Sequence, residues 1–286
     1  MLVGLIGANI QQSLSPALHE DAFAALGIVG HYHLMDVDVL PGRTLDGLLA
    51  AARMAGFAGV NVTFPFKEAV IPLLDAVSDE ARQIGAVNTV VIDKDGHTTG
   101  HNTDRSGFRA GFIEAFGKDA ARGKAVLQLG AGGAGRAVAF ALRDLGVASL
   151  GIYDRDTERA KKLCADLGPC AHALDAPEPA AASAAGIVNA TPIGMTGHEG
   201  LPMTPNVVRA DQFVADVIYT PLETEFVTAA KQRGARTMGG AGMCVHQAVR
   251  AFELFTGRSA DVDRMRRTFL AAADRRAQGD PTCRPA

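Results

Sequence analysis

Short runs of apolar and β-branched residues alternate along the chain with longer alanine-rich stretches. The apolar runs predict strands at 2–7, 31–37, 59–64 and 86–92, and again at 125–130, 149–154, 186–191 and 212–219. The stretches between them predict helices, as in residues 13–27, where Ser15 is expected to cap the amino terminus. Strands that alternate with helices predict an α/β fold with mainly parallel sheets.

Composition narrows the class of protein. The 286 residues are 48% hydrophobic and 21% charged, as in ordinary folded proteins. The net charge of −3, with both signs interspersed, offers no basic face for nucleic acid. No charged leader opens the chain and no apolar stretch approaches the length of a membrane span. We therefore expect a cytoplasmic monomer or homodimer that binds small molecules and neither nucleic acid nor membrane.

The cysteines at 164, 170, 244 and 283 form no paired motif, so we expect neither a disulfide framework nor a metal site. The polar tail past Arg275 is expected to fray.

The glycine-rich run at 130–135 has the strongest local signal for chemistry. A G-x-G-x-x-G pattern stands there between a predicted strand and a predicted helix. The first glycine allows a tight turn, the second lets the backbone approach a pyrophosphate, and the third lets helix and strand pack closely. The helix amino terminus favours negative charge. The pattern predicts a Rossmann-type, doubly wound dinucleotide-binding domain, with a cofactor loop of Gly130, Ala131, Gly132, Gly133, Ala134 and Gly135.

An acidic residue ends the next predicted strand, about 20 residues after the last glycine. Asp154 stands where a carboxylate accepts hydrogen bonds from the adenosine ribose hydroxyls and repels a 2′-phosphate. This sign of charge favours NAD over NADP. Arg155 follows directly and could stack on adenine or hold a phosphate, so NADP stays open.

Two charged residues near the ends of predicted strands are candidates for proton transfer. Lys67 ends the segment NVTFPFK, and Asp104 lies in HNTDRSGF just before the predicted domain boundary. Hydride removal from an alcohol requires a positioned group that takes the hydroxyl proton, and a partly buried lysine can serve. Asp104 would orient Lys67 and hydrogen-bond the substrate. Because a carboxylate opposes the effect of burial on a lysine, the resting protonation state of Lys67 stays open.

A series of motifs resembles the shikimate dehydrogenase family over nearly the whole chain. In order they are SLSP, NVTFPFK, GAVNTVV, HNTDRSGF, GAGGAG, NATPIGM, DVIYTPLET and GMCVHQAVRAF. The resemblance implies an N-terminal α/β substrate-binding domain and a Rossmann domain. We predict a substrate-binding and catalytic domain at 1–105, an NAD(P)-binding domain at 106–238, and C-terminal helices at 239–286 that return to the first domain.

The resemblance also implies roles for individual residues. Lys67 and Asp104 correspond to the family's catalytic pair. The substrate would be bound by Ser13, Ser15, Thr63, Asn88, Tyr219 and Gln247. The nicotinamide would be bordered by Thr191, Met195 and the backbone of Gly240. The histidines at 101, 198 and 246 are expected to be structural or surface residues.

Residues 154–156 depart from the NADP-dependent members of the family. Those members typically carry Asn-Arg-Thr where this chain reads Asp154, Arg155, Asp156. The two carboxylates resemble the NAD-using quinate/shikimate dehydrogenase branch. That branch often has threonine where this chain has Ser15, so the choice between quinate and shikimate stays open.

These observations predict an NAD-dependent oxidoreductase that reversibly oxidises the ring 3-hydroxyl of shikimate, quinate or both to the 3-dehydro acid. The role would lie in quinate catabolism or aromatic amino acid biosynthesis. The alternatives among enzymes are an NADP-dependent biosynthetic shikimate dehydrogenase and an aminoshikimate-type dehydrogenase. The alternative from another class is a sensor that binds a dinucleotide or a cyclic acid without turnover.

Overall fold

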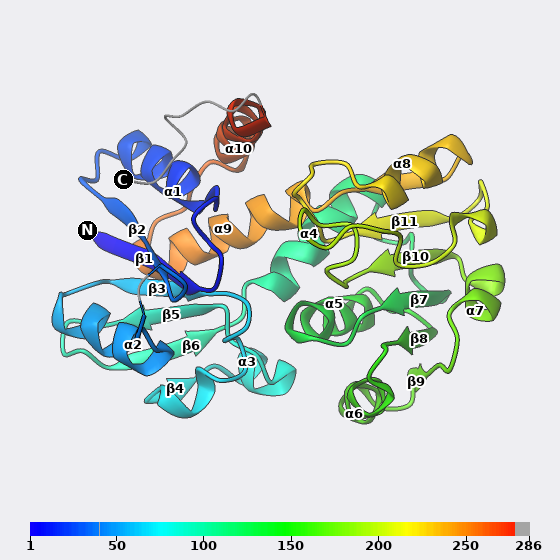
Figure 1. Cartoon of the computed structure of the whole chain (residues 1–286), viewed down its shortest axis with the longest axis horizontal. Helices are drawn as coiled ribbons and strands as arrows, with labels where there is room; N and C mark the ends of the chain where they lie inside the picture. Colours follow the sequence, from blue (N-terminus) through cyan, green and yellow to red (C-terminus); the bar gives the residue numbers. More distant parts are fainter. Residues whose placement is uncertain (40, 278–286) are drawn as a thin grey trace. The chain divides into compact units, whose positions relative to one another are not determined.

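The computed structural model describes residues 1–39 and 41–277, and its helices and strands confirm the predicted α/β class. The chain forms two compact units, coloured by sequence in Figure 1. The first unit contains Met1–Thr103 and the chain from Gln247 onward, and the second contains Asp104–His246. The end of the tail that was predicted to fray, and Cys283 within it, lie outside the described residues.

The first unit is built on a six-stranded sheet of order β2-β1-β3-β5-β6-β4. The strands are β1 (Leu2–Gly7), β2 (His31–Asp36), β3 (Gly59–Val62), β4 (Ala76–Val77), β5 (Thr89–Ile92) and β6 (Thr98–His101). Since β5 runs antiparallel to both of its neighbours, the sheet is mixed. Its apolar core gathers side chains from three strands, among them Ile6, Val60 and Val90.

The first unit also contains helices from both ends of the chain. They are α1 (Ser15–Ala25), α2 (Leu45–Met54), the 3₁₀ helix η1 (Ile71–Leu73), α3 (Asp79–Ile84) and α10 (Val262–Ala277), while α9 (Ala241–Thr256) runs from the second unit into the first. Helix α10 packs beside α1 (Figure 1), where Arg264 donates to both carboxylate oxygens of Asp21 at 2.7 Å. The C-terminal part of the chain therefore completes this unit.

The prediction that Ser15 caps α1 was wrong. Leu14 is the N-cap, its side chain makes no capping bond, and Ser15 is already the first helical residue. The Ser15 N–H donates instead to Oγ of Ser13 at 3.3 Å. The serine before the helix therefore takes over the acceptor role that was expected of Ser15.

The second unit is built on six parallel strands of order β12-β11-β10-β7-β8-β9. The strands are β7 (Ala125–Leu129), β8 (Ser149–Tyr153), β9 (Ala171–Ala173), β10 (Gly186–Asn189), β11 (Phe213–Asp216) and β12 (Arg236–Met238). The helices are α4 (Asp104–Phe116), α5 (Gly133–Asp144), α6 (Thr157–Leu167), α7 (Glu178–Ser183), α8 (Glu225–Gln232) and the 3₁₀ helix η2 (Pro205–Val207). This is the strand order of dinucleotide-binding folds, which confirms the Rossmann-type prediction.

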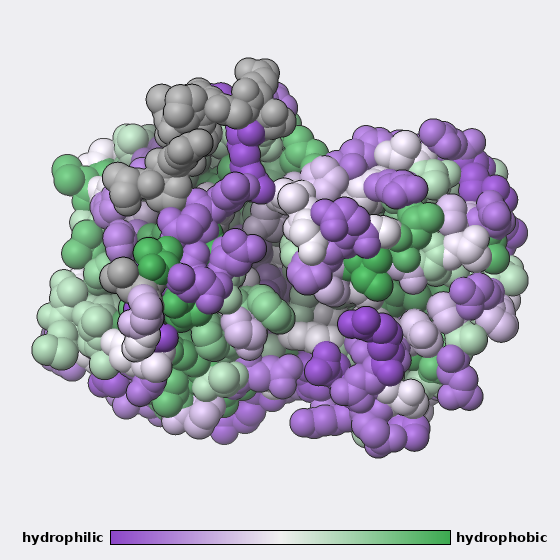
Figure 2. All heavy atoms as spheres, in the orientation of Figure 1, coloured by the Kyte–Doolittle hydropathy of each residue, from purple (hydrophilic) through white to green (hydrophobic). Residues whose placement is uncertain are grey.

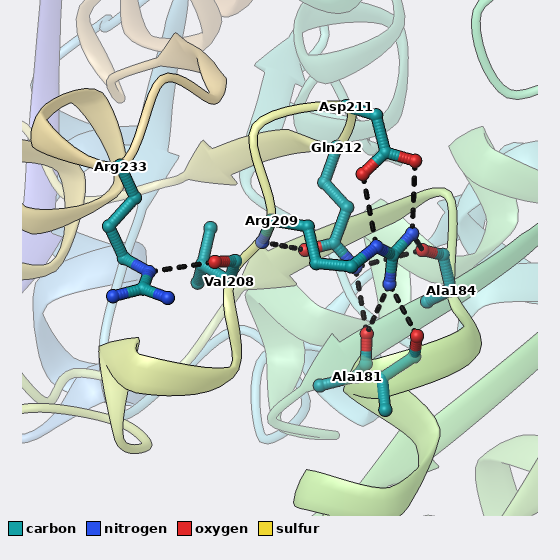
Figure 3. Close-up of polar contacts among 8 residues, drawn as sticks. Ala181, Ala184, Val208, Arg209, Asp211, Gln212 and Arg233 are labelled. Atoms are coloured by element: carbon teal, nitrogen blue, oxygen red, sulfur yellow. Dashed lines mark hydrogen bonds and ion pairs between the residues drawn. The ribbon is translucent and has the colours of Figure 1, made fainter.

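An arginine and a glutamine cap the carboxyl end of helix α7, near the amino ends of these strands (Figure 3). Arg209 donates through Nη1 and Nη2 to carbonyl oxygens at the end of α7 and through Nε to Asp211 at 3.0 Å. Gln212 donates to the carbonyl oxygens of Ala181 and Ala184 at 2.7 and 2.8 Å. A cavity of about 410 Å³ lies beside this cap. All three guanidinium nitrogens of Arg209 are engaged, and dinucleotides bind at the opposite, carboxyl ends of such strands.

Hydrophilic and apolar side chains are interspersed on the face that Figure 2 shows. The large apolar side chains that are most exposed are Val29, Met54 and Phe64. Single exposed apolar residues of this kind are ordinary on protein surfaces. Among the described helices, none has the length and apolarity needed to cross a bilayer.

Candidate functional site

The glycine loop joins β7 to α5 at the point where the strand order of the second sheet reverses. Gly130 has a φ of 97°, and a Cβ there would meet the carbonyl oxygen of Ala190 at 2.7 Å. A Cβ on Gly135 would collide with the carbonyl oxygen of Gly130. A Cβ on Gly132 would meet nothing within 4 Å. One side of the loop is therefore packed against protein, while Gly132 leaves room for a pyrophosphate to approach the backbone.

A buried glutamine holds this loop from within the sheet. The Gln128 side chain donates through Nε2 to the carbonyl oxygens of Gly130 and Gly135, both at 2.8 Å. Sequence reasoning missed this residue, because it treated 125–130 only as an apolar strand. A fully buried amide in the middle of such a strand is the signal that could have identified it.

The structure brings Asp154 to the glycine loop. Its Oδ2 accepts the N–H of Ala131 at 2.7 Å, and its Oδ1 accepts the N–H of Asp156 at 2.9 Å. Arg155 is exposed. The Asp156 carboxylate caps α6 by accepting the N–H of Arg159 at 3.2 Å. Of the two carboxylates in this segment, Asp154 is the one that contacts the loop.

Two further loops leave the carboxyl ends of β10 and β11. Thr191 follows β10, and its Oγ1 donates to Oδ1 of Asn189 at 2.7 Å. The N–H of Thr196 donates to the carbonyl oxygen of Thr220 at 2.9 Å, which links the two loops. The predicted nicotinamide neighbours Thr191 and Met195 lie on the first loop, and Tyr219 lies on the second. The structure thus places these three residues after adjacent strands.

Gly240 lies where only a glycine fits. Its N–H donates to the carbonyl oxygen of Ile218 at 3.0 Å, and a Cβ would collide with the carbonyl oxygen of Val217. The backbone at 240 is therefore held against the loop that contains Tyr219.

In the first unit, Ser13 and Ser15 lie together at the start of α1. Their hydroxyl oxygens are 3.2 Å apart, and both side chains are half-buried. The helix amino terminus at this point favours an anion such as a carboxylate.

Asp36 organises the loop that leads to these serines. This buried carboxylate accepts the N–H of Ile10 at 2.9 Å, the N–H of Asn9 at 3.2 Å and the Gln11 side-chain amide at 3.2 Å. Sequence reasoning missed Asp36, although a carboxylate that ends a predicted strand was a usable signal.

Lys67, Thr63 and Asn88 lie on neighbouring segments of the first unit. The Thr63 N–H donates to the carbonyl oxygen of Ile6 at 3.0 Å, just beyond β3. Lys67 is half-buried, and its carbonyl oxygen accepts the N–H of Val87 at 2.7 Å. These backbone bonds fix both residues of the NVTFPFK segment against the sheet.

Asn88 serves to hold Thr103. Its Oδ1 accepts the Thr103 N–H at 2.8 Å, and its Nδ2 donates to Thr103 Oγ1 at 2.9 Å. Thr103 Oγ1 also lies 3.4 Å from Oε1 of Gln247, so the structure brings Asn88 and Gln247 together through this threonine. Asn88 is 3% exposed and already makes these protein bonds, so any bond to a substrate comes from the capacity that remains.

Asp104 follows Thr103 and is the first residue of α4. Its side chain is buried. Arg105 donates to both carboxylate oxygens of Asp144 at 2.7 and 2.6 Å, which fixes the first turn of α4 on α5. Lys67 belongs to the first unit and Asp104 begins the second, so their pairing stays a prediction.

The three histidines that were expected to be structural or surface residues lie close in sequence to candidate site residues, as His246 does to Gln247. Burial, with the nearby positive charge of Arg250, lowers the pKa of His101. His246 Nε2 lies 3.1 Å from a carboxylate oxygen of Glu114, and His198 lies in the loop after β10. Within the described ranges, no three His, Cys, Asp or Glu side chains are grouped so that they could hold a metal ion.

Comparison with known proteins gives matches over both ends of the chain. The family described as shikimate dehydrogenase substrate binding domain matches residues 5–90, and that described as shikimate 5'-dehydrogenase C-terminal domain matches residues 240–268. A quinate/shikimate dehydrogenase (NAD(+)) of Corynebacterium efficiens is 46% identical over 280 residues, which cover 95% of this chain and 98% of that protein. A shikimate dehydrogenase (NADP(+)) of Streptomyces avermitilis is 46% identical over 273 residues, with coverages of 92% and 93%.

A solved structure of quinate dehydrogenase from Corynebacterium glutamicum in complex with NAD is similar in fold. It has a TM-score of 0.89 and 46% identity, and covers 95% of this chain and 99% of that chain.

Proposed function

The chain belongs to the shikimate dehydrogenase family, and on that premise we propose that it is an NAD-dependent quinate/shikimate dehydrogenase. It reversibly oxidises the ring 3-hydroxyl of shikimate, quinate or both, giving 3-dehydroshikimate or 3-dehydroquinate. The first unit binds the cyclic acid and the second binds the cofactor.

The placement of Asp154 carries the choice of cofactor. Its carboxylate lies 2.7 Å from the Ala131 amide, at the glycine loop where the adenosine ribose binds in this fold. A ribose with free hydroxyls donates hydrogen bonds to such a carboxylate, whereas a 2′-phosphate is repelled by it. The NAD(+) relative at 46% identity and the similar structure in complex with NAD support the same choice.

NAD, when bound, supplies the hydride acceptor. In this proposal Lys67 takes the proton from the reacting hydroxyl and returns it in the reverse direction, because oxidation of an alcohol removes a proton as well as a hydride. Asp104 orients the Lys67 side chain and accepts a hydrogen bond from the substrate. The hydroxyls of Ser13 and Ser15 donate to the substrate carboxylate at the start of α1, which fixes the ring with respect to Lys67.

The test is the initial rate of reduced nicotinamide formation, with shikimate and quinate each combined with NAD and with NADP. The proposal expects turnover with NAD and at least one of the acids. Turnover with neither acid under either cofactor, in protein that binds both ligands, would instead identify a sensor.

An NADP-dependent shikimate dehydrogenase is the second candidate, because Arg155 is exposed beside Asp154 and an NADP(+) relative is also 46% identical. Titrating both cofactors against the wild type and Asp154→Ala separates the two candidates. The NAD reading expects the variant to lose NAD affinity by about tenfold, as befits the loss of hydrogen bonds to a charged group. Unchanged NAD affinity, together with wild-type turnover confined to NADP, would favour the second candidate.

A further inference from the structure

A buried carboxylate ends β11 and receives four hydrogen bonds. Oδ1 of Asp216 accepts the N–H of Ile218 at 3.0 Å, and Oδ2 accepts the hydroxyl of Thr224 at 2.8 Å. Nδ2 of Asn189, at the end of the adjacent strand β10, lies 3.2 Å from both oxygens. Both side chains are fully buried. The network therefore joins the ends of β10 and β11 to the loop that precedes α8.

Asp216 helps to fix which way the Asn189 amide points, together with the carbonyl oxygen of Ile193, to which Asn189 Nδ2 also donates at 3.2 Å. A carboxylate only accepts hydrogen bonds, so it requires the amide nitrogen of Asn189 and turns the amide oxygen the other way. That oxygen accepts both the N–H and the hydroxyl of Thr191, at 3.1 and 2.7 Å. Thr191 Oγ1 in turn accepts the N–H of Ile193 at 3.1 Å. A line of hydrogen bonds thus runs from Asp216 into the loop after β10.

Stability alone is a weak reason to keep a carboxylate in this place. Burial raises the pKa of Asp216, although Ile218, Asn189 and Thr224 all donate to it and oppose that rise. A buried charge costs free energy that an apolar side chain of similar volume avoids. The same charge, however, fixes two loops that begin side by side at the carboxyl edge of the sheet, where ligands bind in this class of fold.

We propose that Asp216 is a positioning residue for the nicotinamide half of the cofactor. Through Asn189 it fixes the loop with Thr191 and Met195, and through Ile218 it fixes the loop with Tyr219. The inference rests on the proposed NAD-dependent function. It assigns the adenosine half to other contacts, at the glycine loop and Asp154; the hydrogen bonds of the network described above are not made to those residues.

The test measures binding of NAD and of ADP-ribose, which lacks the nicotinamide ring, by calorimetry. The main variant is Asn189→Asp, which sets a second acceptor against Asp216. We expect it to weaken NAD binding by about tenfold and to change ADP-ribose binding by less than about twofold. The double variant Asn189→Asp/Asp216→Asn places a donor opposite an acceptor again at the contact between these two residues, while the bond from residue 189 to the Ile193 carbonyl stays lost, so it should recover part of the NAD affinity. Asn206→Asp, an exposed position in the same unit, is the matched control and should leave both affinities unchanged.

Asp216→Asn alone keeps the size of the side chain and is the milder variant if Asn189→Asp does not fold. It should weaken NAD about threefold, with ADP-ribose unaffected. Equal weakening of both ligands, unchanged NAD binding, or no recovery in the double variant would overturn the positioning role. The assay needs no substrate, so a wild type that binds NAD without oxidising either acid would count against the proposed function alone. A wild type that binds neither ligand would overturn both.

Discussion

Acidification should destabilise the first unit through one buried histidine. His19 of α1 stacks on Tyr32 with 4.7 Å between ring centroids, and Phe252 and Phe255 lie at 6.1 and 6.0 Å. The side chain is 1% exposed, and within the described chain its Nδ1 has no hydrogen-bond partner. Burial lowers the pKa of His19 from 6.5 to about 3, because it removes the water that stabilises an imidazolium.

The sign of the effect follows from that pKa. Between about pH 3 and pH 6.5 the unfolded chain binds a proton at this histidine and the folded chain does not. Above this range the folded state has its full stability. As the pH falls through the range, the free energy of unfolding decreases by about 1.4 kcal/mol per pH unit. At about pH 4.5 the loss is about 3 kcal/mol. Attraction between an imidazolium and the surrounding rings, about 1–2 kcal/mol, reduces the loss without reversing it.

The assay is urea unfolding of the wild type and of His19→Leu, which has a similar volume and does not titrate, at about pH 7 and about pH 4.5. Circular dichroism follows the transition, because the chain has no tryptophan. The wild type should lose about 1–3 kcal/mol more than the variant between the two pH values. The exposed His33→Gln is the control and should follow the wild type. A difference between wild type and His19→Leu that does not change with pH would refute the reasoning.

Three further predictions concern the candidate site. Lys67→Ala should lower kcat by about 10²–10⁴-fold with a small change in KM, because it removes a proton-transfer role, and unchanged turnover in the standard rate assay would disprove that role. Asp36→Ala should raise KM for the acid substrate about tenfold, because the loop that leads to Ser13 loses its anchor, while the affinity for NAD serves as the unaffected control. Gly130→Ala should lower the free energy of unfolding, measured by thermal denaturation, by about 1–3 kcal/mol and should weaken NAD binding, because the φ of 97° and the nearby Ala190 carbonyl exclude a Cβ. A variant with wild-type stability and wild-type affinity would contradict this.

The longer strands were predictable because their apolar runs are longer than chance clusters of apolar residues. The run at 2–7 is β1 (Leu2–Gly7), whereas the run at 59–64 stops early, since β3 ends at Val62. There the chain turns, and the N–H of Phe66 donates to the carbonyl oxygen of Thr63 at 2.8 Å. The sequence did not reveal β4, β9 and β12, which have two or three residues each and show no periodicity, nor the polar strand β6.

The residues of the candidate site differ in the same way. Some are positioned by a short local segment, and others by contacts between segments that are distant in the sequence. The glycine loop was recognisable because its geometry depends on residues within one short segment. Gln128 was overlooked because its bonds are to backbone carbonyls, which leave no trace in a motif. Asn189 and Asp216 are 27 residues apart, and only the parallel pairing of β10 with β11 brings them together.

The order in which the chain is synthesised gives the C-terminal segment a particular importance. The second unit is one continuous stretch, Asp104–His246, inserted between the two parts of the first. The first core is incomplete without the later part, since Phe255 of α9 packs directly on Gly59 of β3. During synthesis, residues 1–103 therefore leave the ribosome with part of their core uncovered. This core can be completed only after the whole Rossmann unit has emerged. A gene shortened just after that unit would encode a first unit whose core lacks its C-terminal part. A gene lacking codons 104–246, with a short linker in their place, would still encode both parts of the first core.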